Sequence, residues 1–567
     1  MSANAALSDL AERYWRFECA EAPLTPILAG VPCDAEILFR EAPSDYARRD
    51  RIAGEMLAEL DAIPGTGLVG QERATHSLLR RELASLRAQY AADTHLRPWL
   101  LPAGPDFNTV FFANSCTIST PAEAALYVKR LESIPEFLVH VRENLAAGYA
   151  KGIRYPRAVL EGAVRNTRGI AAPAPIDSPW YGPFKRSAAA QNADIAAAAS
   201  RALAIIGERI IPALHTYAEF MSSDLAVGAR ENLSCVDAPG GKEYYSLYVK
   251  HFTTTDMGPE EVHEIGLAEV ARLEREIAAV AAQAGYGGDV KAYRTFLSTD
   301  PQFLAGSAEE LRQTLESLCK RVDLKIPAFF KRVPRITYGV DIMPAGMSET
   351  MPPAYAQPSA GGSASPGVFW ASSIVAKVPS YMHVPLVVHE AWPGHLMHIA
   401  LLQELEDLPA FRRYGAVKYT ACIEGWALYC EGLAVDMGFY ATPHQHYGRL
   451  EMEMWRAVRL VVDTGIHWHD WSRDQAIAYM SERLALDPAT IAAEVDRYAA
   501  LPGQALAYQI GNLKMRELRA RAEATLGARF THRDYHDAIM SAGAVTLPVL
   551  DDLITNWLAR ESAPRAA

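Results

Sequence analysis

The sequence lacks three patterns that would each define a class of protein. Its seven cysteines are scattered and never form a C-x-x-C pair, so neither a disulfide framework nor a thiolate zinc site is indicated. No run of about 18 apolar residues marks a membrane span. The formal net charge of −12, without a cluster of Lys and Arg among aromatics, argues against a nucleic-acid or anionic-membrane surface. We therefore expect small-molecule partners, with no nucleic acid and no membrane.

The N-terminus also lacks the basic and apolar segments of a secretory signal, because Asp9 and Glu12 interrupt any apolar stretch. Together with the cysteine usage, this favours a mature chain that begins near Met1 and resides in the reducing cytoplasm.

Long linkers are absent as well, so the chain is expected to form one large unit. Half of its 567 residues are apolar and 22% are charged, without a Gly/Ser-rich or Pro-rich divider. We predict a single unit over residues 1–560, with a mainly helical N-terminal subdomain (1–250) and a catalytic subdomain (251–560). Residues 561–567 are expected to fray.

Helical patterns dominate, and strand patterns are few. Residues 120–123 (Thr-Pro-Ala-Glu) form a capping box that predicts a helix ending before Gly152, and a second helix is predicted to open at Pro259. Alternating patterns at 335–343 and 367–376 predict a short β-sheet, and the Pro/Gly/Ser-rich segment 352–366 between them predicts a surface loop. The fold class is thus mostly α, with a small sheet.

The strongest chemical signal lies at residues 389–395 (His-Glu-Ala-Trp-Pro-Gly-His). A catalytic zinc site needs neutral imidazoles, a carboxylate ligand and a base for the metal's water. His389 and His395 are the predicted imidazole ligands, and Glu390 is the predicted base. The cofactor is therefore predicted to be zinc.

The spacing of these histidines is unusual. Ligands four residues apart share one helical face, but six residues turn a regular helix so that the two side chains lie about 120° apart. Pro393 cannot donate to a helical carbonyl, and Gly394 adopts unusual dihedral angles at low cost. We predict a helical bulge at these two residues that brings His389 and His395 together.

A second segment, residues 424–431 (Glu-Gly-Trp-Ala-Leu-Tyr-Cys-Glu), supplies the predicted carboxylate ligand. Glu424 lies in an almost uninterrupted apolar run, where a carboxylate is costly to bury unless it is paired or bound to a cation. Glu431 follows two helical turns later on the same face, where it would support a ligand histidine or pair with an arginine.

Other polar residues near these motifs have two interpretations each. His398 is either a support for the centre or a rival ligand to His395. Arg456 and Arg459 lie on an apolar helix, where guanidinium groups either pair with buried carboxylates or clamp a substrate carboxylate. His467 would either donate to the transition state or line the cleft.

Several motifs resemble bacterial proteins grouped as domain of unknown function 885. These are the two segments above, residues 459–467 (Arg-Leu-Val-Val-Asp-Thr-Gly-Ile-His), residues 502–511 (Pro-Gly-Gln-Ala-x-x-Tyr-x-Ile-Gly) and residues 241–245 (Gly-Lys-Glu-Tyr-Tyr). That family in turn resembles helical gluzincin peptidases such as Taq-type carboxypeptidases and angiotensin-converting enzyme. This chain departs from the family pattern at Leu396, often a histidine, and in the loop at 360–367, where charged residues are common.

The resemblance implies a helical enzyme with a deep internal cleft, and zinc bound by His389, His395 and Glu424. It also implies that Tyr508, on a late helix, donates to the oxyanion of the transition state. The predicted function is that of a metallopeptidase for short peptides. A zinc amidase for a non-peptide metabolite and a binding protein without turnover are the alternatives, and the oligomeric state stays open.

Overall fold

The computed structural model of the protein describes residues 3–101, 104–359 and 366–563. These residues form a mostly helical body with one three-stranded sheet, so the predicted fold class is confirmed. The first ten helices are α1 (Ala3–Glu21), α2 (Leu24–Leu28), α3 (Pro43–Asp61), α4 (Gly70–Ala91), α5 (Pro105–Ser115), α6 (Pro121–Ala150), α7 (Arg157–Ala171), α8 (Gly182–Arg186), α9 (Ala193–Ile205) and α10 (Ile211–Phe220).

The second part of the chain begins with α11, and its elements surround the two predicted metal segments. In chain order they are α11 (Gly241–Thr253), α12 (Pro259–Ala281), α13 (Val290–Thr299), α14 (Ala308–Asp323), α15 (Ile326–Phe329), β1 (Tyr338–Ile342), α16 (Ala345–Thr350), β2 (Ala354–Gln357), β3 (Gly367–Ala371), α17 (His383–Glu390), α18 (His395–Gln403), α19 (Ala410–Arg413), α20 (Thr420–Asp436), α21 (Pro443–His467), α22 (Arg473–Arg483), α23 (Pro488–Ala500), α24 (Ala507–Leu526), α25 (His532–Ala542) and α26 (Leu547–Ser562).

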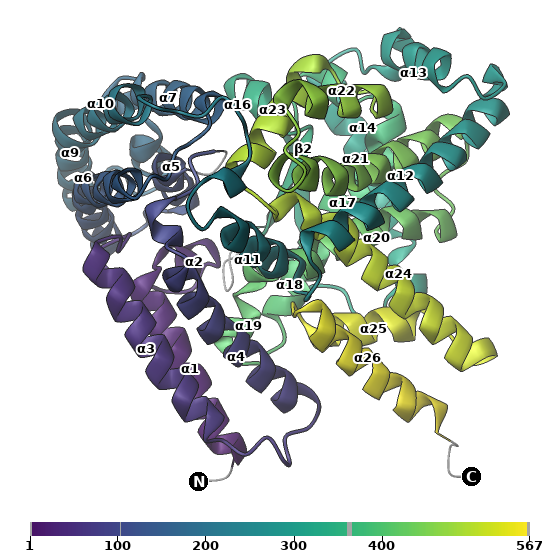
Figure 1. Ribbon diagram of the computed structural model, residues 1–567, viewed down its shortest axis with the longest axis horizontal. Coiled ribbons are helices and arrows are strands. Elements are labelled where there is room, and N and C mark those ends of the chain that lie inside the picture. Colours follow the sequence, from purple (N-terminus) through teal and green to yellow (C-terminus); the bar gives the residue numbers. More distant parts are fainter. Residues whose placement is uncertain (1–2, 102–103, 360–365, 564–567) are drawn as a thin grey trace.

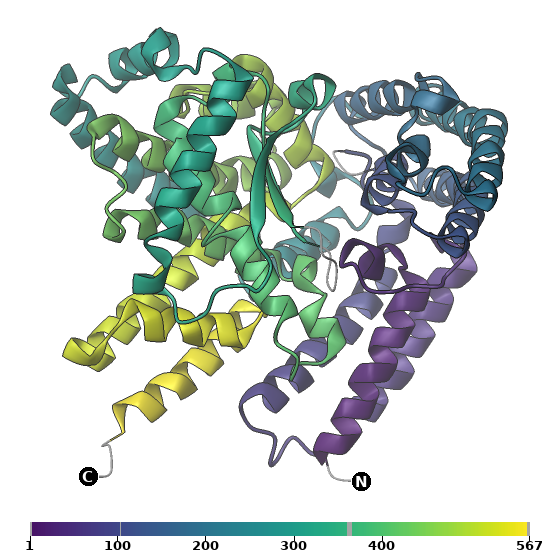
Figure 2. The same ribbon diagram turned by 180° about the vertical axis from the view of Figure 1, so that it is seen from behind.

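The two parts of the chain lie side by side (Figure 1). Helices α1, α3 and α4 form a long hairpin-like layer at one edge, with α6, α7, α9 and α10 beyond its end. Figure 2, the view from behind, shows the second part of the chain beside the first, with the sheet in front of the helices of the second part. Helix α19 packs on α1, α26 on α4 and α23 on α7, so contacts join the two parts at several levels. Within the described residues, no helix is long and apolar enough to cross a membrane.

Both predicted helix starts are confirmed. Thr120 caps α6 by accepting a hydrogen bond from the Glu123 N–H, and the Thr120 N–H in turn donates to the Glu123 carboxylate. Helix α12 begins at Pro259 as expected. Helix α26 ends at Ser562, near the start of the segment 561–567 that is expected to fray, and residues 564–567 lie outside the described residues.

The sheet contains one strand more than predicted. Its order is β1-β3-β2, with β1 parallel and β2 antiparallel to β3. The prediction that 352–366 is a loop was wrong at β2, while 360–365 lies outside the described residues. Prolines flank β2 and suggested a loop, but an edge strand tolerates proline at its ends, and Tyr355 pairs with Trp370 across the sheet. The sheet lies against α17 and α18.

Helix α20 is central to the second part and packs closely against α24. The backbones touch where Gly425 faces Gly511: a Cβ on Gly425 would lie 2.4 Å from the Gly511 carbonyl carbon. Any side chain at this crossing would separate the helices. The contact thus fixes the start of α24, including Tyr508, beside the part of α20 that carries Glu424.

Candidate metal centre

Residues 389–395 form the junction of two helices. A bulge in one continuous helix was predicted, but α17 ends at Glu390 and α18 begins at His395. The four intervening residues make a turn with a cis peptide bond before Pro393. Gly394 is required there, because a Cβ at this position would lie 1.9 Å from the His389 carbonyl oxygen. The close approach of these two backbones breaks the helix instead of bulging it.

The break brings the side chains of His389 and His395 together. Their ring centroids are 4.8 Å apart, with the ring planes perpendicular. Glu424 faces both rings from α20: its Oε2 atom lies 3.5 Å from His389 Nε2 and 3.3 Å from His395 Nε2. Glu390 completes the group, because one ligand atom each from His389, Glu390 and His395 lie within 4.8 Å of one another.

These distances suit a tetrahedral metal ion. Ligand atoms about 2.0–2.1 Å from a tetrahedral zinc are about 3.3–3.4 Å from one another, close to the observed separations. Glu424 Oε2 is buried and has no hydrogen-bond partner among the described residues. A buried carboxylate oxygen that faces two imidazole nitrogens without a hydrogen bond is a donor set that zinc satisfies.

The charges of the site depend on one another. Burial alone would lower the pKa of His389, but its contacts with Glu424 and Glu431 raise that pKa to about 9. Burial would raise the pKa of Glu424, yet the neighbouring His395 and His389 hold it well below its ordinary value. The carboxylate is therefore ionised at neutral pH, and a bound cation would replace the proton of His389.

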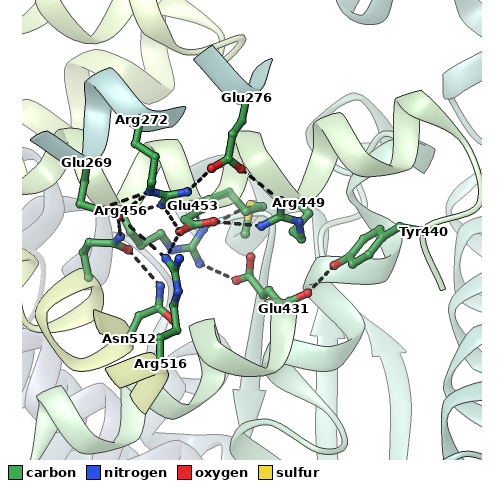
Figure 3. A network of polar contacts seen from close by, with 12 residues as sticks. Glu269, Arg272, Glu276, Glu431, Tyr440, Arg449, Glu453, Arg456, Asn512 and Arg516 are labelled. Carbon is green, nitrogen blue, oxygen red and sulfur yellow. Dashed lines mark hydrogen bonds and ion pairs between the residues drawn. The ribbon is translucent and has the colours of Figure 1, made fainter. Parts of the chain in front are cut away.

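Glu431 orients His389 from the opposite side of the ring. Its Oε1 atom is 2.8 Å from His389 Nδ1, and its side chain is 1% exposed. This bond leaves Nε2 free to face Glu424, which is the arrangement of a supported metal ligand. In Figure 3, Glu431 lies between Arg456 and Tyr440, whose hydroxyl donates to the Glu431 carbonyl.

Arg456 and Arg459 on α21 both pair with carboxylates of other helices. An Arg456 nitrogen lies 3.8 Å from Glu431 Oε1, and Arg459 contacts Glu494 at 2.9 Å. Arg459 also covers the ring of Tyr508, with its guanidinium carbon 4.6 Å from the ring centroid. Of the two interpretations, pairing describes both residues in this structure.

Glu390 and Tyr508 keep free polar atoms. Among the described residues, no hydrogen bond or ion pair engages the carboxylate of Glu390, although only 8% of the residue is exposed. The hydroxyl of Tyr508 likewise bonds to no described residue, and its side chain is half-buried. Both groups are available to a bound molecule.

His398 and His467 occupy different surroundings. His398 is buried against Trp426, and neither ring nitrogen has a partner within the described part of the chain. Burial, with the charge of His395, lowers its pKa to about 3. His467 joins backbone groups: Nδ1 accepts from the Cys235 N–H at 3.1 Å, and Nε2 donates to the Tyr498 carbonyl at 2.9 Å.

Asp463 supports the site, although its position in the motif 459–467 was not predicted to have a role. Its fully buried carboxylate accepts bonds from the Tyr245 hydroxyl at 2.7 Å and from the Gly503 N–H at 3.1 Å. Gly503 has a positive φ of 81° and lies in the turn that leads into α24 and Tyr508. The sequence signal that could have identified Asp463 is an acidic residue inside the mostly apolar segment 460–466.

The comparison with known proteins supports the family resemblance of the sequence motifs. The family model described as "Bacterial protein of unknown function (DUF885)" matches residues 23–554. The chain belongs to this family. No curated protein matches the sequence.

Two solved structures are similar to this DUF885 protein. One, described as "the putative lipoprotein from Colwellia psychrerythraea", is 26% identical and has a TM-score of 0.92, with 99% of this chain and 100% of that one covered. The other, described as "a putative lipoprotein of unknown function from Shewanella oneidensis", is 16% identical with a TM-score of 0.72, covering 97% and 99%. The second likeness concerns the fold alone.

Proposed function

We propose that this DUF885 protein is a zinc-dependent hydrolase, a metallopeptidase that cleaves amide bonds of short peptides. The observation that carries the proposal is the pair of 3.3 and 3.5 Å separations between Glu424 and the two histidines. A carboxylate oxygen at this distance from each of two imidazole nitrogens, with Glu390 beside the histidines, fits the donor set of a catalytic zinc site.

The residues would divide the chemistry as follows. His389, His395 and Glu424 hold the ion, which when bound supplies a polarised water and a Lewis acid for the scissile carbonyl. Glu390 takes a proton from the attacking water at a carboxylate oxygen and passes it to the leaving amine nitrogen. The Tyr508 hydroxyl donates to the oxyanion that develops on the carbonyl oxygen. The free carboxylate and the free hydroxyl described above support these two roles.

The resemblance of the motifs to helical gluzincin peptidases favours peptides as substrates. The same centre on the same scaffold would also serve an amidase for another small molecule, because both reactions attack an amide carbonyl with water. A panel of di- and tripeptides with free and blocked ends, compared with non-peptide amides, separates these substrates. Cleavage of some peptides is expected, and cleavage of non-peptide amides alone would refute the peptidase assignment.

Glu390→Gln tests the mechanism itself. The amide cannot accept the water's proton, so we expect kcat to fall by about 10²–10⁴-fold while zinc stays bound. The matched control is Glu406→Gln, which makes the same change at an exposed carboxylate that pairs with Arg335 on the surface. If activity and zinc content both survived in Glu390→Gln, Glu390 would not be the base.

A further inference from the structure

The carbonyl of Pro393, at the break between α17 and α18, is held by a side chain from another helix. Trp426 of α20 donates from its indole Nε1 to this oxygen at 2.9 Å. Trp426 is fully buried, and Pro393 is buried too. The bond therefore joins the turn that sets the direction of His395 to the helix that carries Glu424.

The turn has few bonds of its own. The Ala391 N–H closes α17 by donating to the Val387 carbonyl, and the His398 N–H bonds to the Gly394 carbonyl as α18 begins. Pro393 has no N–H to donate. Its carbonyl lies beyond the last turn of α17 and before the first of α18, so the indole supplies the partner that a buried carbonyl needs.

The indole ring is fixed in place by other aromatic rings. Tyr429, His536 and His398 have ring centroids 5.3, 5.5 and 5.7 Å from that of Trp426. A ring packed on several sides cannot follow the turn if the turn moves. Trp426 is thus a rigid anchor for the Pro393 carbonyl.

Three side chains of α20 consequently meet the two short helices. Glu424 faces the Nε2 atoms of both histidines, Trp426 bonds to the turn between them, and Glu431 bonds to Nδ1 of His389. Helix α20 supplies a ligand, the fixation of the turn and the support of a ligand within two helical turns.

We propose that Trp426 is a positioning residue of the metal centre: its indole N–H holds the break so that His395 meets His389 and Glu424. Trp426 contributes no ligand and acts through Pro393. This inference rests on the proposed function, because it presumes that these residues bind zinc.

The test compares the zinc affinity of Trp426→Phe with that of wild type, measured by competition with a chromogenic chelator. Trp180→Phe is the matched control, since Trp180 is also fully buried and donates from Nε1 to Thr109 Oγ1 at 3.2 Å in the N-terminal part of the chain. Each substitution removes the same side-chain atoms and one hydrogen bond donated by an indole N–H. We expect zinc affinity to fall about 10- to 100-fold in Trp426→Phe, as for other groups that support metal ligands, and to stay at the wild-type value in Trp180→Phe.

A second readout and a second variant guard against simple misfolding. Cobalt(II) bound in place of zinc has a visible spectrum that reports ligand geometry, and we expect its bands to shift only for Trp426→Phe. Replacing Trp426 by 3-benzothienylalanine, which has sulfur in place of the indole N–H, keeps the ring shape and should reproduce both effects.

The outcomes separate this inference from the proposed function. If wild type bound zinc, and both Trp426 replacements kept its affinity and cobalt spectrum, the positioning role would be refuted while the metal centre stood. Equal losses in Trp426→Phe and Trp180→Phe would also refute it, because they would reflect general destabilisation. If wild type itself bound no zinc, the proposed function would fall, and this inference with it.

Discussion

Replacement of Gly394 by alanine should disable the proposed metal centre, because the break between α17 and α18 has no room for a Cβ. That atom would lie 1.9 Å from the His389 carbonyl oxygen and 2.5 Å from the Val388 carbonyl oxygen. Real Cβ atoms essentially never come closer than 3.0 Å, so the two backbones must separate by about 1 Å. Zinc sites tolerate errors of about 0.2 Å in ligand distance. We therefore expect zinc affinity to fall by about 100-fold or more, beyond the range for supporting groups.

The assay is the dissociation constant for zinc, measured by chelator competition, together with thermal unfolding of the metal-free protein. Gly432→Ala on α20 is the matched control, because a Cβ there meets nothing within 4 Å. It should bind zinc as wild type does and stabilise its helix by roughly 0.5–1 kcal/mol. If Gly394→Ala bound zinc within about threefold of wild type, a difference below 1 kcal/mol, the reasoning about the break would be refuted.

Three further changes test other parts of the account. Tyr508→Phe should lower kcat about 10²–10³-fold at unchanged zinc content, as loss of an oxyanion donor does, and unchanged kcat would exclude that role. Glu431→Gln should weaken zinc binding about 10- to 100-fold, because His389 loses the bond that orients its ring. A zinc affinity equal to that of wild type, measured by chelator competition, would contradict this role of Glu431. Asp463→Asn should flatten the pH dependence of the unfolding free energy. Burial raises the pKa of Asp463 from 3.8 to about 7, so its contribution to stability is present below about pH 4 and is lost as pH rises to about 7. The unfolding free energy is measured by denaturant titration at several pH values. If it depended on pH in the same way in the variant and in wild type, the raised pKa of Asp463 would be contradicted.

Much of the centre could be predicted because its signals are local. The six-residue spacing of His389 and His395, with Pro393 and Gly394 between them, indicated a departure from a regular helix. Helical periodicity placed Glu431 on the face of Glu424. The structure brings these side chains together, but the helix breaks where a bulge was predicted. Whether a helix bulges or breaks depends on how closely its backbones approach, here the His389 carbonyl and Gly394, and the sequence does not show that distance.

The parts that could not be predicted depend on contacts distant in sequence. Strand β2 exists because Tyr355 and its neighbours pair with β3, which composition does not show. The indole of Trp426 bonds to a carbonyl 33 residues away, and an apolar run gives no sign of that donor's partner. Asp463 joins α21 to Tyr245 and Gly503 from two other regions of the chain. Such long-range bonds become visible only in the folded protein.

The metal content of the purified protein shows whether His389, His395 and Glu424 bind zinc. We predict about one zinc per chain in wild type and its loss in His389→Ala, His395→Ala and Glu424→Ala, with retention in His398→Ala. Zinc retained in His395→Ala but lost in His398→Ala would contradict the ligand set, and a metal-free wild type after zinc addition would contradict zinc binding altogether.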